Sequence, residues 1–219
     1  MQQRLRAWTT VPALLALAVS VGLAPASERP DGWRQWGGDD GGFTFDPKPF
    51  NGAWQELHPT LLERRALGPG YSAVVTDGRA LYTMYADGTE EVVVQLDGSL
   101  RDVAEFRSTP GSQGPRSDGG PRSTPLIAGK RLVTIGASSD LYCLDARTLE
   151  PLWQMNLWER FGGNPLVYGY ASSPIRDGER LIVPVGGPGA SVVALDLASD
   201  SSWPSWRRSS FRWTRRTAR

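Results

Sequence analysis

The sequence has very few of the residues that most often build metal and redox sites. It holds one cysteine, Cys143, and one histidine, His58, among 219 residues. A single cysteine excludes an internal disulfide and a cysteine-based metal site, and a single histidine excludes a paired-histidine site. Cys143 takes an alternating strand position in "DLYCLD", so we interpret it as a small buried hydrophobic residue, with a reactive thiol as the alternative. We interpret His58, in "ELHPT", as a solvated loop residue.

An excess of charge of either sign is also missing. The 24 basic and 23 acidic residues give a formal net charge of +1. The chain as a whole therefore offers no electrostatic reason to bind nucleic acid, and we expect no nucleic-acid partner.

Only one long apolar run occurs, and it lies at the N-terminus. Arg4 and Arg6 precede "VPALLALAVSVGLA", which is too short to span a bilayer comfortably. Small residues for a signal peptidase follow at Ala24-Pro25-Ala26. We expect residues 1–26 to be a cleaved signal peptide and the mature protein to be exported to the periplasm or the extracellular space, without a transmembrane segment. An uncleaved anchor is the alternative.

Turn-forming residues, by contrast, are abundant, and they belong to a repeat. The 25 glycines and 17 prolines favour many turns. Three segments align, "YSAVVTDGRALYT" (71–83), "RSTPLIAGKRLVT" (122–134) and "ASSPIRDGERLIV" (171–183). They share a glycine at intervals of 51 and 49 residues, and each later reaches a Leu-Asp pair. The shared residues are Gly78, Gly129 and Gly178, followed by Asp97, Asp145 and Asp196.

The spacing within each repeat predicts a four-stranded sheet. A glycine between two apolar runs is typical of a hairpin turn, which needs positive φ. A second strand, another turn and a third strand follow, and "PLWQMNL" adds a fourth in the middle copy. Four short strands in about 50 residues are typical of one β-propeller blade. We therefore predict an all-β fold with about three four-stranded blades, an incomplete fragment of an eight-bladed propeller. A β-sandwich is the alternative.

The middle repeat carries a family signature. "SSDLYCLDARTLEPLW" resembles the closing motif of pyrroloquinoline-quinone (PQQ)-like propeller repeats, in which Asp ends a strand, a Thr-Gly turn follows and a Trp docks between blades. Asp145, Thr148 and Trp153 match this motif. Leu149 stands where the family has glycine, and a left-handed leucine would cost about 1–2 kcal/mol. "WRQWGGDDGG" (33–42) resembles the tryptophan-rich entry segment of secreted bacterial members.

The resemblance covers roughly residues 33–200 and implies a domain organisation. After the signal peptide we expect an entry segment rich in tryptophan and glycine (27–64), the PQQ-like repeats (65–200) and a basic tail (201–219). Three blades without neighbours would leave two open flanks that expose apolar residues.

The family allows two different functions. It contains quinone-dependent alcohol and sugar dehydrogenases, and also a scaffold subunit of the outer-membrane β-barrel assembly machinery, so the fold alone does not choose. The enzymes would need an aspartate base, Ca²⁺ ligands and, in several members, an adjacent cysteine pair. No residue matches the base or a ligand, and the cysteine pair is impossible. We therefore expect a non-catalytic module that binds protein, with no cofactor. A dehydrogenase fragment using PQQ and Ca²⁺ is the alternative.

The remaining polar and aromatic motifs have structural interpretations. We interpret five aspartates at turns as turn caps: Asp77, Asp87, Asp145, Asp177 and Asp196. Asp39 and Asp40 in "GGDDGG" are interpreted as part of an entry loop, with a cation site as the alternative. Trp153 and Trp158 are interpreted as blade-packing aromatics.

Two segments interrupt the repeat. Residues 105–125 are rich in Gly, Pro and Ser, and we expect a long surface loop in place of the first repeat's fourth strand. Residues 203–219 hold six Arg, three Trp and no acid. This tail has three possible origins: a segment that binds anionic membranes or nucleic acid, a disordered end, or out-of-frame translation.

Overall fold

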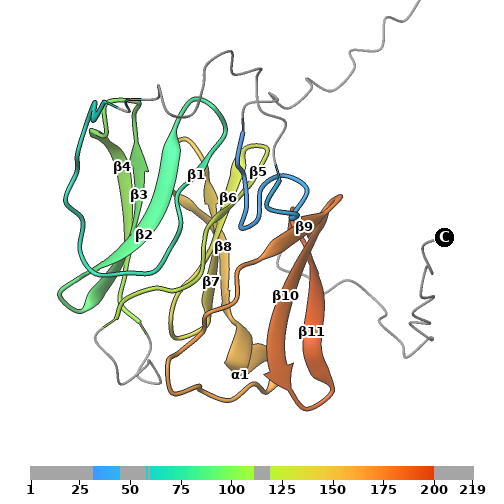
Figure 1. The fold of residues 1–219 in the computed structure, drawn as a ribbon. Helices are drawn as coiled ribbons and strands as arrows, with labels where there is room; N and C mark the ends of the chain where they lie inside the picture. Colours follow the sequence, from blue (N-terminus) through green and yellow to red (C-terminus); the bar gives the residue numbers. More distant parts are fainter. Residues whose placement is uncertain (1–31, 45–57, 59, 111–118, 200–219) are drawn as a thin grey trace, which may run out of the picture.

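The computed structural model describes residues 32–44, 58, 60–110 and 119–199 (Figure 1). The predicted signal peptide and the predicted basic tail lie outside these residues. Within the described part of the chain, no helix is long and apolar enough to cross a membrane.

The described strands form three antiparallel sheets in which every strand pairs with its neighbour in sequence (Figure 1). Blade 1 comprises β1 (Val75–Thr76), β2 (Leu81–Asp87), β3 (Glu90–Leu96) and β4 (Asp102–Ser108). Blade 2 comprises β5 (Leu126–Ala128), β6 (Arg131–Ile135), β7 (Asp140–Asp145) and β8 (Pro151–Asn156). Blade 3 comprises β9 (Ile175–Asp177), β10 (Arg180–Gly187) and β11 (Ala190–Asp196). The predicted all-β fold with propeller blades is confirmed, and one short helix, α1 (Leu157–Phe161), follows β8.

Each blade begins with the predicted glycine turn. Gly78, Gly129 and Gly178 have φ values of 81°, 62° and 61° and join the first strand of a blade to the second. A Cβ atom at Gly129 or Gly178 would meet no atom within 4 Å. The backbone conformation, and not a lack of space, therefore favours glycine in these turns.

The two ends of each blade differ. The turn between first and second strands and the turn between third and fourth strands lie at one end, which we call the turn end. The connections to the next blade leave from the opposite end, the connection end, where α1 also lies (Figure 1).

The sequence predicted a loop over residues 105–125 in place of the fourth strand of the first repeat. This prediction was wrong for residues 105–108. Glu105–Ser108 belong to β4, which pairs with β3. The alternating Ala104 and Phe106 side chains pack against the core between blades 1 and 2. The charged Glu105 and Arg107 alternate with them and are exposed, which is common on the edge strand of a sheet. These charges made the strand hard to recognise from the sequence.

Each blade buries one face against the next. Tyr82, Met84 and Val93 of blade 1 pack with Leu132 and Leu144 of blade 2. The alternate residues of blade 2 face the other way.

Blade 2 makes the second core with blade 3, where Val133, Ile135 and Cys143 pack with Leu181 and Val183. Cys143 is fully buried, and burial raises the pKa of its thiol to about 11. The interpretation of Cys143 as a buried hydrophobic residue is confirmed.

The prediction of two open flanks was wrong for blade 1. Its outward-facing Tyr85, Val92, Val94 and Leu96 are buried. The chain before β1 lies against this sheet, since the Ala86 N–H donates to the Pro69 carbonyl at 2.8 Å. At the other flank, blade 3 does leave Ile175 and Val192 exposed.

The entry segment crosses the inner edge of all three blades (blue in Figure 1). Trp33 and Thr76 exchange backbone hydrogen bonds of 2.8 and 2.9 Å, and the Ile127 N–H donates to the Arg34 carbonyl at 2.8 Å. The Arg176 N–H donates to Gln35 Oε1 at 3.3 Å. Thr76, Ile127 and Arg176 each lie two residues before the turn glycine of their own repeat. Three successive residues thus bind the equivalent position of three successive blades.

We expect Gln35→Met to lower the free energy of unfolding by about 1–2 kcal/mol, because it leaves the Arg176 amide without its acceptor. The matched control is Gln154→Met, at an exposed position of β8, which should change stability by less than about 0.5 kcal/mol. Urea unfolding measures both, and equal effects would contradict the bridging role of Gln35.

Leu149 adopts the left-handed conformation that the signature implies, with φ at 58°. Its side chain is 2% exposed and packs in the core between blades 1 and 2. Burial of a leucine contributes about 1.5–3 kcal/mol, which offsets a backbone cost of about 1–2 kcal/mol. Packing therefore explains why the chain tolerates leucine at a position that favours glycine.

Both Leu149→Ala and Leu149→Gly should lower the free energy of unfolding, by about 2–4 kcal/mol, because each leaves a cavity. The glycine variant should retain about 1 kcal/mol more than the alanine variant, since glycine removes the strain of positive φ. Denaturant unfolding compares the two variants. An alanine variant as stable as the glycine variant would contradict a backbone strain at position 149.

Candidate functional site

The aspartates that close each repeat cap their own turns. Asp145 Oδ1 accepts from the backbone N–H groups of Arg147 and Thr148 at 2.9 and 3.0 Å. Asp97 and Asp196 accept two backbone N–H bonds in the same way. The hydrogen bonds from the turn lower the pKa values of the Asp97 and Asp145 carboxyls. An ionised carboxylate already engaged in this way is a poor general base.

The other aspartates interpreted as turn caps divide into two groups. Asp77 Oδ1 accepts from the N–H groups of Arg79 and Ala80 at 2.9 and 3.1 Å, as a cap does. Asp87 and Asp177 instead form ion pairs, with Arg107 at 2.8 Å and with Arg180 at 2.6 Å.

The threonine of the signature stabilises its own turn, and the tryptophan serves the blade junction. Thr148 Oγ1 donates to Asp145 Oδ1 at 3.3 Å and accepts from the Glu150 N–H at 3.3 Å. Trp153 Nε1 donates to the Leu197 carbonyl at 3.4 Å and so joins blade 2 to the chain after β11. Trp158 is buried in the core between blades 2 and 3.

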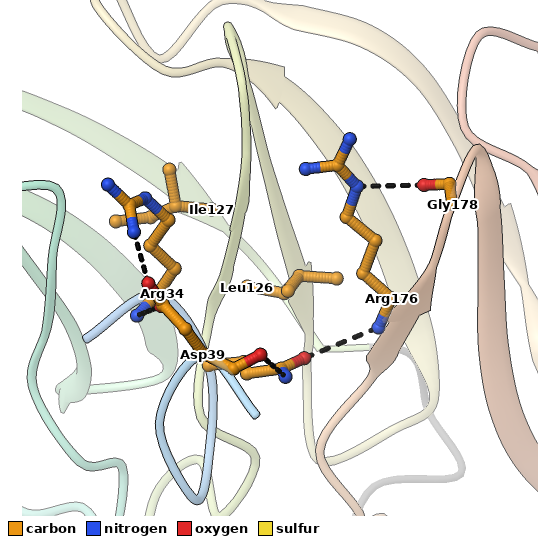
Figure 2. A pocket seen from close by; sticks show the side chains of 7 residues that line it. Arg34, Asp39, Leu126, Ile127, Arg176 and Gly178 are labelled. Carbon is orange, nitrogen blue, oxygen red and sulfur yellow. Dashed lines mark hydrogen bonds and ion pairs between the residues drawn. The ribbon is translucent and has the colours of Figure 1, made fainter. Parts of the chain in front are cut away.

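A small cavity of about 170 Å³ lies where the entry segment meets blades 2 and 3 (Figure 2). It is lined by Arg34, Gln35, Asp39, Leu126, Ile127, Arg176 and Gly178. We call it the axial pocket.

The polar groups of the axial pocket engage one another (Figure 2). Arg34 forms an ion pair with Asp39, and the Arg34 N–H donates to Asp39 Oδ1 at 2.9 Å. Arg176 Nε donates to the Gly178 carbonyl at 2.8 Å. Asp39, the alternative cation ligand, is therefore bound by an arginine. Asp40 accepts from the Gly42 N–H and the Thr44 hydroxyl, and the first of these bonds leads the lowering of its pKa.

A larger cleft of about 600 Å³ lies between blades 1 and 2 at the turn end. We call it the interblade cleft. It is lined by Asp77, Arg79, Ala80, Tyr82, Gln95, Gly129, Lys130, Asp145, Ala146 and Arg147. The sequence interpretation missed its buried polar residues, Tyr82 and Gln95. Burial raises the pKa of Tyr82 to about 12, so its hydroxyl is protonated at neutral pH.

A cluster of two tyrosines and an arginine lies at the connection end. The Arg122 guanidinium carbon lies 4.8 Å from the ring centre of Tyr71 and 5.8 Å from that of Tyr168. Arg122 Nη1 also donates to the Tyr168 carbonyl at 2.9 Å. Leu166 and Val167, next in the chain, are 61% and 78% exposed. Sequence interpretation missed this Tyr71–Arg122–Tyr168 cluster, because its members come from three different connecting segments.

Metal-ligating side chains do not gather in the part of the chain that the structure describes. No three His, Cys, Asp or Glu residues lie there so that they could share an ion. His58 is exposed.

One carboxyl group is buried at the junction of blades 1 and 2. Glu91 is 4% exposed, and its Oε1 accepts from the Ala137 N–H at 2.9 Å. Desolvation raises its pKa above the ordinary value of about 4.5, although the Ala137 bond opposes the shift. Ionisation of Glu91 is therefore harder in the folded state, and its contribution to stability falls as pH rises from about 4.5 through the folded-state pKa.

Glu91→Gln should raise the melting temperature at pH 7, because the amide keeps an acceptor for Ala137 without a buried charge. The difference from the parent should shrink as the pH is lowered below 4.5, where Glu91 is protonated in both states. Thermal melts at pH 4 and pH 7 measure it, with the exposed Glu159→Gln as a control. A glutamine variant that is less stable at pH 7 would contradict this account of Glu91.

No protein-family model and no curated protein sequence matches the chain. Several solved structures are similar to it at low sequence identity. A europium-containing methanol dehydrogenase is 18% identical, with 63% of this chain and 24% of that chain covered and a TM-score of 0.46. BamB from Moraxella catarrhalis is 18% identical, with 61% and 34% covered and a TM-score of 0.40.

A quinohemoprotein alcohol dehydrogenase from Comamonas testosteroni is also 18% identical, with 62% and 20% covered and a TM-score of 0.45. The matched region amounts to between about a fifth and a third of the length of these structures. The three sheets themselves define the propeller-type fold of the chain.

Proposed function

We propose that the chain is an exported PQQ-like propeller-repeat module that binds another protein and performs no catalysis. The observation that carries this proposal is the Tyr71–Arg122–Tyr168 cluster. Tyrosine and arginine are enriched among the residues that contribute most to protein–protein binding. Export is proposed on the predicted signal peptide at residues 1–26.

The geometry of the cluster suits a binding surface. Arg122 lies against both rings, so part of the conformational freedom of its side chain is already restricted before a partner binds. Tyr71 and Tyr168 remain 66% and 65% exposed, next to the exposed Leu166 and Val167. Exposed apolar groups bordered by polar ones are typical of protein interaction sites.

The axial pocket does not fit PQQ and Ca²⁺. The axial pocket, at about 170 Å³, is smaller than the roughly 300–1,000 Å³ of typical small-molecule sites. Its one carboxylate, Asp39, is bound by Arg34, whereas Ca²⁺ takes about six to eight oxygen ligands. The turn aspartates Asp97 and Asp145 are engaged by backbone N–H groups. These observations favour the non-catalytic proposal over the dehydrogenase alternative.

A photo-crosslinking amino acid at Tyr168 or Tyr71, in cells that export the protein, should give the same discrete protein adduct at both positions. The matched control is Val103 on β4, which is 57% exposed but belongs to an edge strand away from the cluster. Gel electrophoresis and mass spectrometry of the adduct measure the result. No adduct at the two tyrosines, or an identical adduct at Val103, would contradict the proposed interface.

Addition of PQQ with Ca²⁺ should give no dye reduction with an alcohol or a sugar, because the axial pocket does not fit them and the turn aspartates are already engaged by backbone N–H groups. Dye reduction with an alcohol or a sugar after this reconstitution would overturn the non-catalytic proposal and favour the dehydrogenase alternative.

A further inference from the structure

The interblade cleft contains polar groups that the repeat does not require. Tyr82 on β2 and Gln95 on β3 are cross-strand partners in blade 1. Tyr82 is aligned across the repeats by its distance from the turn glycine, and Gln95 by its distance from the closing aspartate. The equivalent positions in blade 2 hold Val133 and Cys143. In blade 3 they hold Ile182 and Ala194. A blade can therefore form with an apolar pair at these positions, so the fold alone does not explain the polar pair in blade 1.

Gln95 presents an acceptor that the protein leaves unused. The Tyr82 hydroxyl has one proton, which it donates to the Ala146 carbonyl at 2.8 Å. Gln95 Nε2 must therefore donate to the Tyr82 oxygen, at 3.3 Å, which fixes the orientation of the amide. Gln95 lines the cleft and is 7% exposed, and its Oε1, which is itself buried, has no hydrogen-bond partner among the described residues. A buried acceptor without a partner costs about 1–3 kcal/mol, which a bound donor would remove.

The rim of the interblade cleft is cationic. Arg79, Lys130 and Arg147 line it and are exposed. Within the described ranges, no side-chain hydrogen bond or ion pair engages these three cations. The two carboxylates of the rim, Asp77 and Asp145, are each engaged by backbone N–H groups of their own turns. The three cations outnumber the two carboxylates, so the rim carries a net positive charge, and the floor has a buried acceptor without a partner.

We propose that the interblade cleft binds a small organic anion that carries a hydroxyl or amino donor. Its carboxylate or phosphate lies at the rim with Arg79, Lys130 and Arg147, and its donor bonds to Gln95 Oε1 on the floor after a small movement of the side chains that cover this oxygen. This site lies at the turn end, whereas the proposed protein interface lies at the connection end. The two proposals are therefore independent of each other.

Isothermal titration calorimetry of the full chain tests the site with three probes. Tartrate and glycerol 3-phosphate each combine an anion with hydroxyl donors, as carboxylate and phosphate respectively. Succinate has the charge of tartrate but no hydroxyl group. We expect tartrate or glycerol 3-phosphate to bind, and the one that binds identifies the anionic group. Tartrate, if it binds, should exceed succinate by about fivefold, the effect of one hydrogen bond.

Three variants separate the two parts of the site. Gln95→Leu should weaken binding about fivefold and should fold normally, because the other blades hold apolar residues there. Arg147→Ala should weaken binding about tenfold and lies on the surface, so misfolding cannot account for its effect. The matched control is Arg160→Ala on α1, outside the cleft, which should leave affinity unchanged.

Three outcomes would overturn the proposal. Neither tartrate nor glycerol 3-phosphate binds, or succinate binds as tightly as tartrate, or Gln95→Leu and Arg147→Ala bind as the parent does. Equal binding of succinate and tartrate would mean that the cleft attracts anions by charge alone. Unchanged binding by both variants would mean that the anion binds outside the cleft.

Discussion

The hydrogen bonds of the entry segment to the inner strands are the contacts on which the rest of the structure depends. The inner strand of a blade has one free edge, and buried N–H groups on that edge must find acceptors. Trp33, Arg34 and Gln35 supply them in turn to Thr76, Ile127 and Arg176. Because these three residues occupy the same repeat position, a single short segment sets the relative placement of three blades. It also forms one wall of the axial pocket.

The residues that distinguish one blade from another lie mostly near the two ends of the blades. Inside the blades, alternating apolar residues pack two continuous cores between neighbouring blades. The departures from this pattern are polar or exposed. Tyr82 and Gln95 depart from it at the turn end, and Tyr71, Arg122 and Tyr168 at the connection end. The proposed small-molecule site and the proposed protein interface therefore lie at opposite ends of the same blades.

The structural features that were predictable from the sequence are those that are local in the chain or repeated along it. The glycine turns follow from residues adjacent in the chain, and the left-handed Leu149 follows from its place in the signature motif. Strand β4 was missed because outward charges obscured its alternation, and the covered flank of blade 1 was missed because no repeat rule places residues 60–70. The cation–π cluster depends on Tyr71 and Tyr168, 97 residues apart in the chain, meeting at Arg122. The signal for Gln95 was present, since the repeats align an apolar residue with it.

Amide hydrogen exchange tests the central claim most directly. In the parent chain, the amides of Thr76, Ile127 and Arg176 should all be protected. Deleting residues 32–44 removes all three acceptors and should weaken that protection at all three positions together, while amides within the β2–β3 and β6–β7 pairs stay protected. Unchanged protection at Thr76, Ile127 and Arg176 would contradict the claim that the entry segment joins the blades.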